Sequence, residues 1–170
     1  MHSLRPLERA DLPLVLSWRN HPAISRYMCN QHHIELEEHL RWFERVSQDP
    51  RQELLIYEVG DRPWGYLNFT HKAQGEIAEW GFYVAPDAQR GTGTCMTSSA
   101  LRFAFANRGL HKLSAQVLAY NERSIHLHRK LGFQQEGLLR AQHFCGEKYH
   151  DIYCFGLLAS EWKASPEESK

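Results

Sequence analysis

A glycine-rich segment between a predicted strand and a predicted helix carries the strongest chemical signal in this sequence. It reads Gln89-Arg90-Gly91-Thr92-Gly93-Thr94 and follows an apolar run that ends at Val84. Glycines let the backbone turn so that successive N–H groups and the positive end of the helix dipole converge on an anion. The segment lacks the Gly-Lys-Ser/Thr ending of a Walker loop and the third glycine of a Rossmann fingerprint. It predicts a pyrophosphate-binding loop, with an ordinary glycine-rich helix start as the alternative.

Residues 121–133 form a second motif, Asn121-Glu122-Arg123-Ser124-Ile125-His126-Leu127-His128-Arg129-Lys130-Leu131-Gly132-Phe133. A strand, an Arg-Gly-x-Gly-x loop and a helix, followed by Asn-x-x-Ser-Ile-x-Leu-x-x-Lys-Leu-Gly-Phe, resemble the acetyl-CoA-binding half of the Gcn5-related N-acetyltransferase (GNAT) superfamily. Both motifs occur in the expected order and at the expected separation, so the match is specific. The resemblance implies an acetyl-CoA-dependent N-acetyltransferase that transfers the acetyl group directly and uses no metal.

The resemblance extends from Leu4 to Trp162. The blocks at residues 16–22, 24–28 and 38–43, which contain Trp-Arg-Asn, Arg-Tyr-Met and His-x-x-Trp-Phe, are similar to the pseudaminic-acid branch of the superfamily. That branch acetylates UDP-4-amino-4,6-dideoxy-N-acetyl-β-L-altrosamine. The ending, residues 144–162, occurs in similar form in ribosomal-protein and diamine acetyltransferases, so it supports the superfamily more than the substrate.

The resemblance assigns roles in binding acetyl-CoA to particular residues. The strand that ends at Val84 is expected to splay from its neighbour at a β-bulge, leaving amides free for the pantetheine arm and the thioester carbonyl. Asn121 matches the family residue that reaches the pantetheine, with a plain helix cap as its alternative. The expected cofactor-binding residues are Phe82, Tyr83, Val84, Gln89, Arg90, Gly91, Thr92, Gly93, Thr94, Asn121, Ser124 and Arg129.

Acetyl transfer to an amine needs a base for the amine proton and stabilisation of the departing thiolate. Glu79, on the strand that enters the splay, is the candidate base, and a cross-strand charge partner is its alternative role. His128 stands where the family commonly has the tyrosine that serves the thiolate. A protonated His128 is one candidate acid, Tyr83 and Tyr120 are others, and a thiolate that leaves unaided remains open. The alternative reading of His128 is a histidine on the helix surface.

Recognition of the acceptor is expected in the helical first third of the chain. Arg19 can pair with a diphosphate, and His39 and Trp42, three residues apart on a helix, can offer planar surfaces to a base or a sugar. Arg26 and Lys72 are further candidates for the same cleft. Surface charge is the alternative role for the arginines and His39.

The leading hypothesis is transfer of acetyl to the 4-amine of the UDP-linked amino-dideoxy sugar named above, on a route to pseudaminic acid for surface glycans such as those on flagellin. The alternatives are a protein N-terminus or a polyamine as acceptor. A CoA-binding module without catalysis is a further alternative, suggested by His128 and by Cys95 at the end of the glycine loop.

The elements that must position these residues follow from hydrophobic periodicity. Residues 4–7 predict a strand, and residues 11–46 predict mainly helices. Strands are expected at 54–59, 64–69, 77–84 and 113–118, a helix after the glycine loop, and another from Asn121 to Leu131. Two more strands, at 137–144 and 149–158, complete the pattern. The predicted class is α/β, a GNAT-like acyl-CoA N-acyltransferase fold with a mostly antiparallel mixed central sheet flanked by helices.

Composition sets the remaining limits. The chain has 170 residues and a formal net charge of +0, which favours one domain and argues against nucleic acid as a partner. Its short apolar runs and its N-terminus predict a cytoplasmic protein without a membrane span. Four scattered cysteines predict reduced thiols. We expect one domain at residues 1–163, a flexible tail at 164–170, and a free edge strand that would allow a homodimer.

Overall fold

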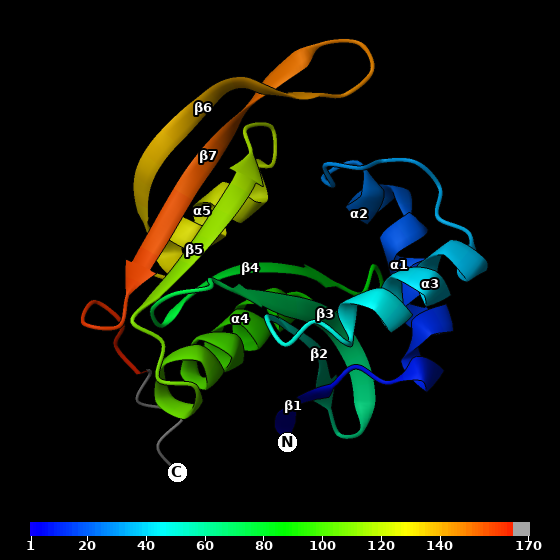
Figure 1. Cartoon of the computed structure of the whole chain (residues 1–170), viewed down its shortest axis with the longest axis horizontal. Coiled ribbons are helices and arrows are strands. Elements are labelled where there is room, and N and C mark those ends of the chain that lie inside the picture. The colour runs from blue at the N-terminus through cyan, green and yellow to red at the C-terminus, as the bar shows by residue number, and fades with distance from the viewer. Residues whose placement is uncertain (165–170) are drawn as a thin grey trace.

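The computed structural model describes residues 1–164, and within them all strands join one seven-stranded sheet of order β1-β2-β3-β4-β5-β7-β6 (Figure 1). All of the expected tail except Ala164 lies outside the described residues. The elements are β1 His2–Pro6, η1 Arg9–Asp11, α1 Leu12–Asn20, α2 Pro22–Ser25, α3 Leu36–Val46, β2 Gln52–Val59, β3 Arg62–His71, β4 Ile77–Val84, α4 Thr92–Arg102, the π-helical turn η2 Phe103–Asn107, β5 Lys112–Leu118, α5 Glu122–Lys130, β6 Gln134–Phe144 and β7 Tyr149–Leu158.

The sheet separates two apolar clusters because successive side chains of a strand point to opposite faces. On β2, Leu54 and Ile56 pack with α1 and α3 on one face. Leu55 and Tyr57 point to the other face, where α4 and α5 pack. The result is three layers, with the helices from the first third of the chain on one side and the two later helices on the other.

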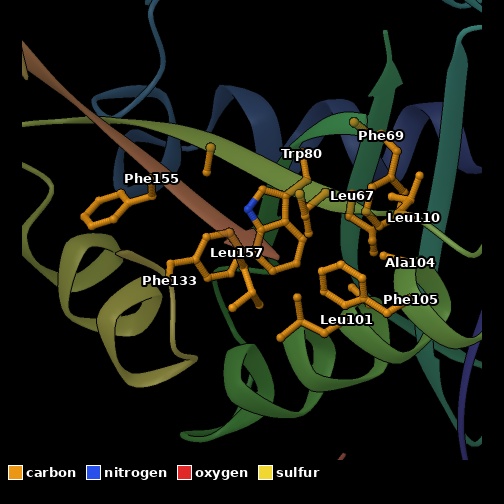
Figure 2. Close-up of a cluster of buried hydrophobic side chains, with 14 of the residues drawn as sticks. Leu67, Phe69, Trp80, Leu101, Ala104, Phe105, Leu110, Phe133, Phe155 and Leu157 are labelled. Carbon is orange, nitrogen blue, oxygen red and sulfur yellow. The ribbon is translucent and has the colours of Figure 1, made fainter. Parts of the chain in front are cut away.

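The larger cluster ties the two halves of the sheet to α4 and α5 (Figure 2). Trp80 on β4 stacks on Phe133 with 5.4 Å between ring centroids, next to Phe155 and Leu157 of β7. Leu101, Ala104 and Phe105 reach the same cluster from the α4–η2 segment. Aromatic and aliphatic packing therefore fixes where β4 lies relative to β5 and β7.

Strand pairing changes character at the centre of the sheet. β1 to β4 pair as an antiparallel meander, whereas β4 and β5 are parallel, with α4 as the crossover. Their pairing covers only three residue pairs, from Ile77 with Lys112 to Glu79 with Ser114. Beyond Glu79 the two strands diverge. The expected splay is present, but the expected bulge is not, because the β3–β4 register runs without a shift from Gly65–Val84 to His71–Ala78.

The glycine loop joins β4 to α4 through a left-handed residue. Gly91 is the N-cap of α4 and has a φ of 95°, a conformation that costs L-residues energy. Gly132 has the same φ just after α5, where the sequence predicts a helix end. Within residues 1–164, no helix has the length and apolar character needed to span a membrane.

The cluster around Phe155 predicts a large stability effect. Phe155 is 1% exposed, so Phe155→Ala leaves a cavity and should lower the free energy of unfolding by about 3–5 kcal/mol. Phe144, which is 53% exposed, is the matched control, and Phe144→Ala should change it by only about 0.5 kcal/mol. Urea unfolding monitored by circular dichroism measures both. Equal losses in the two variants would contradict this account of the core.

Candidate active site

Three adjoining cavities lie around the divergence of β4 and β5 in the described part of the chain. The central cavity, about 400 Å³, lies between the two diverging strands. The glycine-loop cavity, about 280 Å³, follows the end of β4 to Gln89 and Gly93. The α3 cavity, about 610 Å³, lies between α3 and the meander. Met28 lines all three, so the cavities adjoin one another between the glycine loop and α3.

The central cavity holds the residues that bear on acetyl transfer. Glu79, the last residue of β4 that pairs with β5, contributes its side chain to the wall. Beyond it, residues 80–82 line the cavity with a strand edge that has no partner in the β5 register. Asn121, Ser124 and His128 approach from α5. A carboxylate, free backbone amides and polar helix residues thus surround one space.

Glu79 is half-buried and makes no hydrogen bond or ion pair with any residue in the described range 1–164. Its register partners are Thr70 and Ser114, neither of which carries charge. The alternative role of a cross-strand charge partner therefore has no support in this geometry. The carboxylate is free to face a ligand.

The glycine-loop cavity contains part of the expected cofactor set. Phe82, Tyr83 and Val84 form one wall. Asn121 and Ser124 line both this cavity and the central one. Asn121 also caps α5, since its side chain accepts from the Ser124 N–H at 3.2 Å. The cap and the ligand-facing position coexist, so the two readings of Asn121 are not exclusive.

The glycine loop places the N-terminus of α4 beside this cavity. Gln89 and Gly93 line it, whereas Arg90 is exposed beside it. Arg123, which the sequence analysis passed over, is also in the wall and adds positive charge. Anions bind well at such helix starts, so the chain's own residues fit a pyrophosphate here.

His128 does not lie on the helix surface, and this corrects the alternative reading of that residue. It is 2% exposed and packs among Trp80, Phe82, Phe133 and Phe155. Burial lowers its pKa below the ordinary value of 6.5. Its Nε2 lies 3.1 Å from the Trp80 indole N–H, and its Nδ1 lies 2.8 Å from the Ser124 carbonyl oxygen.

These contacts argue against His128 as the acid. Trp80 can only donate, so the Nε2 atom of His128 must be unprotonated, and a carbonyl can only accept, so Nδ1 carries the proton. The ring is neutral, and its single N–H is already used. A histidine in this state has no proton to give to a thiolate.

Tyr83 and Tyr120, the other two candidate acids, differ in their surroundings. Burial raises the pKa of Tyr83 far above the ordinary value, and its side chain lines the glycine-loop and α3 cavities. The Tyr120 hydroxyl donates to the Arg26 carbonyl at 2.8 Å and accepts from Gln31 at 2.9 Å. Tyr120 therefore joins the β5–α5 connection to the segment after α2, and its proton is already used.

The α3 cavity contains two buried polar groups without partners. Arg19 is 6% exposed and His39 is 5% exposed. Arg19 uses Nη2 to donate to the Asn30 carbonyl, while its Nη1 and the Nε2 of His39 have no hydrogen-bond partner. Burial lowers the pKa of both groups, and the guanidinium nevertheless stays charged. Groups of this kind in a cavity wall are suited to meet a ligand.

His39 and Trp42 stack on each other, with ring centroids 5.0 Å apart and planes 17° apart. They form one flat wall of the α3 cavity, not two separate platforms. Trp42 in turn meets Tyr66 edge-on at 6.4 Å. The aromatic surface expected from the helical spacing is therefore present as one surface that the two stacked rings form together.

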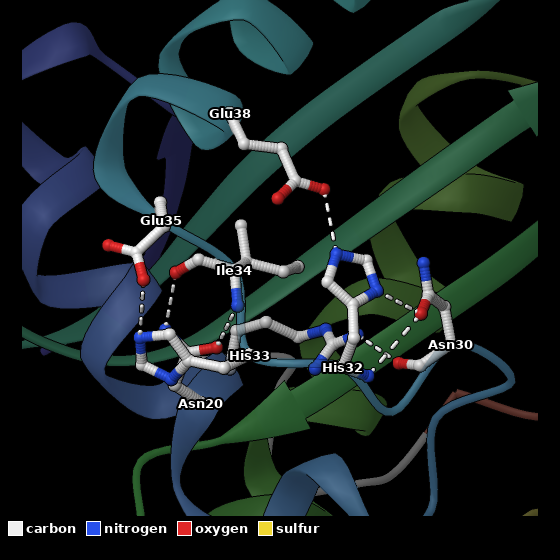
Figure 3. A network of polar contacts seen from close by, with 8 residues as sticks. Asn20, Asn30, His32, His33, Ile34, Glu35 and Glu38 are labelled. Carbon is white, nitrogen blue, oxygen red and sulfur yellow. Dashed lines mark hydrogen bonds and ion pairs between the residues drawn. The ribbon is translucent and has the colours of Figure 1, made fainter.

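The segment between α2 and α3 covers this region and is held by polar contacts (Figure 3). The Asn20 side chain exchanges two hydrogen bonds with the backbone of Ile34, at 2.8 and 2.9 Å. His32 lies 2.8 Å from the Glu38 carboxylate and also contacts Asn30. These contacts fix the segment whose Met28 and Asn30 line the central and α3 cavities.

Seven expected binding residues are absent from the walls of these three cavities: Arg26, Lys72, Arg90, Gly91, Thr92, Thr94 and Arg129. The Arg26 guanidinium lies over the Tyr27 ring, 4.7 Å from its centroid. Lys72 follows the far end of β3, and Arg129 lies in the last turn of α5, where it reaches Gln135. Conversely, Arg41 and Arg45 line the α3 cavity, although the sequence analysis did not predict a role for them. Their spacing from Glu38 places the three residues on one face of α3, and this pattern could have identified them.

Comparisons with known proteins identify the family and the fold. A family model described as an acetyltransferase (GNAT) domain matches residues 3–134. The acetyltransferase PseH of Campylobacter jejuni is 27% identical over 127 residues, covering 75% of this chain and 79% of that protein. The spermidine N(1)-acetyltransferase of Escherichia coli K12 is 29% identical over 154 residues, covering 87% and 81%. A crystal structure of spermidine N-acetyltransferase from Vibrio cholerae with CoA and spermine matches with a TM-score of 0.87 at 24% identity, covering 94% and 96%.

The diverging strands, the glycine loop and these matches define an acetyltransferase of the GNAT class. The chain belongs to that family and has its fold. It is an enzyme that transfers an acetyl group from acetyl-CoA to an amine. The alternative of a CoA-binding module without catalysis has no support from these findings.

The buried histidines predict how stability depends on pH. The folded-state pKa of His128 lies below its unfolded value near 6.5, so the unfolded chain binds more protons below that pH. The stabilisation is present above about pH 6.5 and is lost as the pH falls, by up to about 1.4 kcal/mol per pH unit for each such group. His128→Gln should reduce this slope in urea unfolding between about pH 7.5 and 5.5.

His126, which is exposed on the same helix, is the matched control. His126→Gln should leave the slope as in the unmodified protein. A slope that His128→Gln does not change would show that His128 is not held neutral in the folded state.

Proposed function

We propose that the protein acetylates the amine of an anionic, nucleotide-linked amino sugar. The acceptor that fits best is UDP-4-amino-4,6-dideoxy-N-acetyl-β-L-altrosamine, acetylated at its 4-amine on the route to pseudaminic acid and glycans such as those on flagellin. Support on the sequence side comes from the similarity to PseH of C. jejuni. Residues 1–163 would act as one domain, since one sheet contains every described strand.

One observation carries the proposal: the α3 cavity has a buried arginine with an unpartnered N–H group. Leaving such a group without an acceptor costs about 1–3 kcal/mol, and more when it is charged. A phosphate oxygen would satisfy the Arg19 Nη1 group, and a sugar or base oxygen would suit the neighbouring His39 Nε2. A polyamine offers only further donors to Arg19.

The charges of the cavity wall favour the same class of acceptor. Arg19, Arg41 and Arg45 line it against a single carboxylate, Glu38. That carboxylate already contacts His32 at 2.8 Å. A wall with an excess of arginine attracts an anion and repels a polycation.

The stacked pair of His39 and Trp42 adds a flat apolar surface to this charged wall. A planar base or the face of a sugar ring can pack on such a surface. An arginine beside an aromatic wall can bind the diphosphate of a nucleotide-linked sugar while its base or sugar ring packs on the aromatic face.

A spermidine-type acceptor is the second candidate, because spermidine acetyltransferases of E. coli and V. cholerae match this chain as well as PseH does. Their similarity covers most of the chain. Only the α3 cavity, with its arginines and its single carboxylate, separates the two candidates.

In the proposed mechanism, Glu79 takes the proton from the acceptor amine, directly or through one water, as the nitrogen attacks the thioester carbonyl. The free amides of β4 beyond Glu79 stabilise the developing oxyanion. The glycine loop and Arg123 hold the pyrophosphate of acetyl-CoA, and Asn121 contacts its pantetheine arm. An acceptor bound across the adjoining α3 and central cavities, which share Arg19, Met28 and Asn30, would place its amine at the carbonyl.

The acceptor class can be tested by free-thiol release from acetyl-CoA. The UDP-linked amino sugar should be turned over, whereas spermidine and a lysine peptide should not. Arg19→Met should raise the acceptor KM by about 10- to 100-fold, the usual cost of losing a charged hydrogen bond, with little effect on the KM of acetyl-CoA.

Arg9, an exposed arginine paired with Glu44, provides the control, and Arg9→Met should behave as the unmodified enzyme. Turnover of spermidine alone would discard the nucleotide-sugar proposal and retain the acetyltransferase. An Arg19→Met variant with an unchanged acceptor KM would discard the role of Arg19.

The role of Glu79 predicts a specific kinetic change. Glu79→Gln keeps the shape and removes the base, so kcat should fall by about 10²- to 10⁴-fold and the KM of acetyl-CoA should stay similar. Glu76→Gln, at an exposed position just before β4, is the matched control. Full activity of Glu79→Gln would rule out this base.

A further inference from the structure

The segment that contains Met28 and Asn30 has little backbone bonding of its own. Within the described range 1–164, residues 29–34 neither donate nor accept a backbone–backbone hydrogen bond. The segment nevertheless forms cavity walls, since Met28 lines all three cavities and Asn30 lines the central and α3 cavities. Side-chain contacts must therefore hold it, because ordering an irregular segment costs conformational entropy that its own backbone bonds do not offset.

Tyr120 ties this segment to the connection between β5 and α5. Its hydroxyl donates to the Arg26 carbonyl at 2.8 Å and accepts from the Gln31 Nε2 group at 2.9 Å. The same Nε2 group donates to the Arg26 carbonyl at 3.0 Å. A side-chain amide has two N–H groups and a carbonyl oxygen has two lone pairs, so each group can serve both of its partners. We call this closed set of three hydrogen bonds the Tyr120 triangle.

Two aromatic neighbours hold the Tyr120 ring in place. Tyr27 stacks on it with 5.9 Å between ring centroids, and His150 of β7 meets it edge-on at 4.6 Å. A ring packed in this way presents its hydroxyl at a fixed position. The Tyr120 triangle therefore fastens the segment to the half of the sheet that contains β5 and β7.

The triangle bears directly on the direction of the Arg19 side chain. The carbonyl of Asn30, in the peptide group that joins it to Gln31, accepts the hydrogen bond from Arg19 Nη2. Holding the Gln31 side chain therefore limits how far this carbonyl can move. Because the guanidinium is planar, a fixed Nη2 also fixes the direction of the unpartnered Nη1 group.

We propose that Tyr120 is a positioning residue for acceptor binding. It acts through Gln31 and the Asn30 carbonyl on the direction of the Arg19 guanidinium. This inference rests on the proposed function, in which the Arg19 Nη1 group binds an anionic acceptor. Tyr120 lines none of the three cavities, so its effect on the acceptor is indirect.

Limited proteolysis without any acceptor tests the hold on the segment. Trypsin cleaves after Arg26, and the carbonyl of that peptide bond is the one that the triangle binds, so cleavage requires the triangle to open. Tyr120→Phe keeps the ring and removes the hydroxyl. Cleavage between residues 26 and 27 should become about 3- to 10-fold faster, the usual worth of one hydrogen bond. Mass spectrometry of the fragments measures the initial rate, and Tyr149→Phe, at a position 65% exposed, is the control.

Steady-state kinetics test the consequence for the acceptor. Tyr120→Phe should raise the acceptor KM by about 3- to 10-fold, with little change in kcat or in the KM of acetyl-CoA. Gln31→Leu, at an exposed position, should have the same effect because it opens the same triangle. In an Arg19→Met background, Tyr120→Phe should cause no further increase, since its effect passes through Arg19.

Three results would overturn the role of Tyr120. They are an unchanged cleavage rate in Tyr120→Phe, an acceptor KM that Arg19→Met raises but Tyr120→Phe does not, and effects of the two substitutions that multiply in the double variant. Failure of the proposed function gives a different result, in which Arg19→Met itself leaves the acceptor KM unchanged. That result would discard the anionic acceptor and this role of Tyr120 with it, whereas the faster cleavage of Tyr120→Phe would remain.

Discussion

The active site depends on one structural constraint, the end of parallel pairing between β4 and β5 after three residue pairs. Pairing stops at Glu79, and the next residues of β4, Trp80 and Phe82, pack against His128 of α5. These rings lie on the face of the sheet that α4 and α5 cover, while the central cavity occupies the space between the diverging strands. The divergence therefore frees a strand edge, exposes a carboxylate at its apex and brings the N-terminal end of α5 to the opening. Loss of this aromatic packing would remove the site along with the core.

The segment between α2 and α3 completes the site from the other face of the sheet. Met28 reaches all three cavities, and Arg19 lines both the central and the α3 cavities. The Asn20–Ile34 and His32–Glu38 contacts hold the segment in place (Figure 3). Arg19 therefore lies where the central and α3 cavities adjoin. Its buried Nη1 group has no hydrogen-bond partner, and this is the observation on which the proposed acceptor class rests.

Much of the fold could be predicted because local rules dominate it. The strand–glycine loop–helix order, the left-handed Gly91 and the Asn121 cap all follow from short-range backbone geometry. The sequence-based predictions were wrong where tertiary packing determines the position of a side chain. His128 was expected at the helix surface or in catalysis, yet aromatic neighbours from β4 and β7 bury it. Strand divergence occurs without the expected bulge, and the Arg26 guanidinium lies over the ring of the neighbouring Tyr27, not in a cavity wall.

The central claim is that the α3 cavity is built for an anion, and equilibrium binding tests it without turnover. The measurement is the dissociation constant of UDP, and separately of spermine, for the CoA-bound enzyme by calorimetry at low and moderate salt. The account predicts that UDP binds, that its affinity falls as salt increases, and that spermine binds far more weakly. Tight binding of spermine with none of UDP would contradict it.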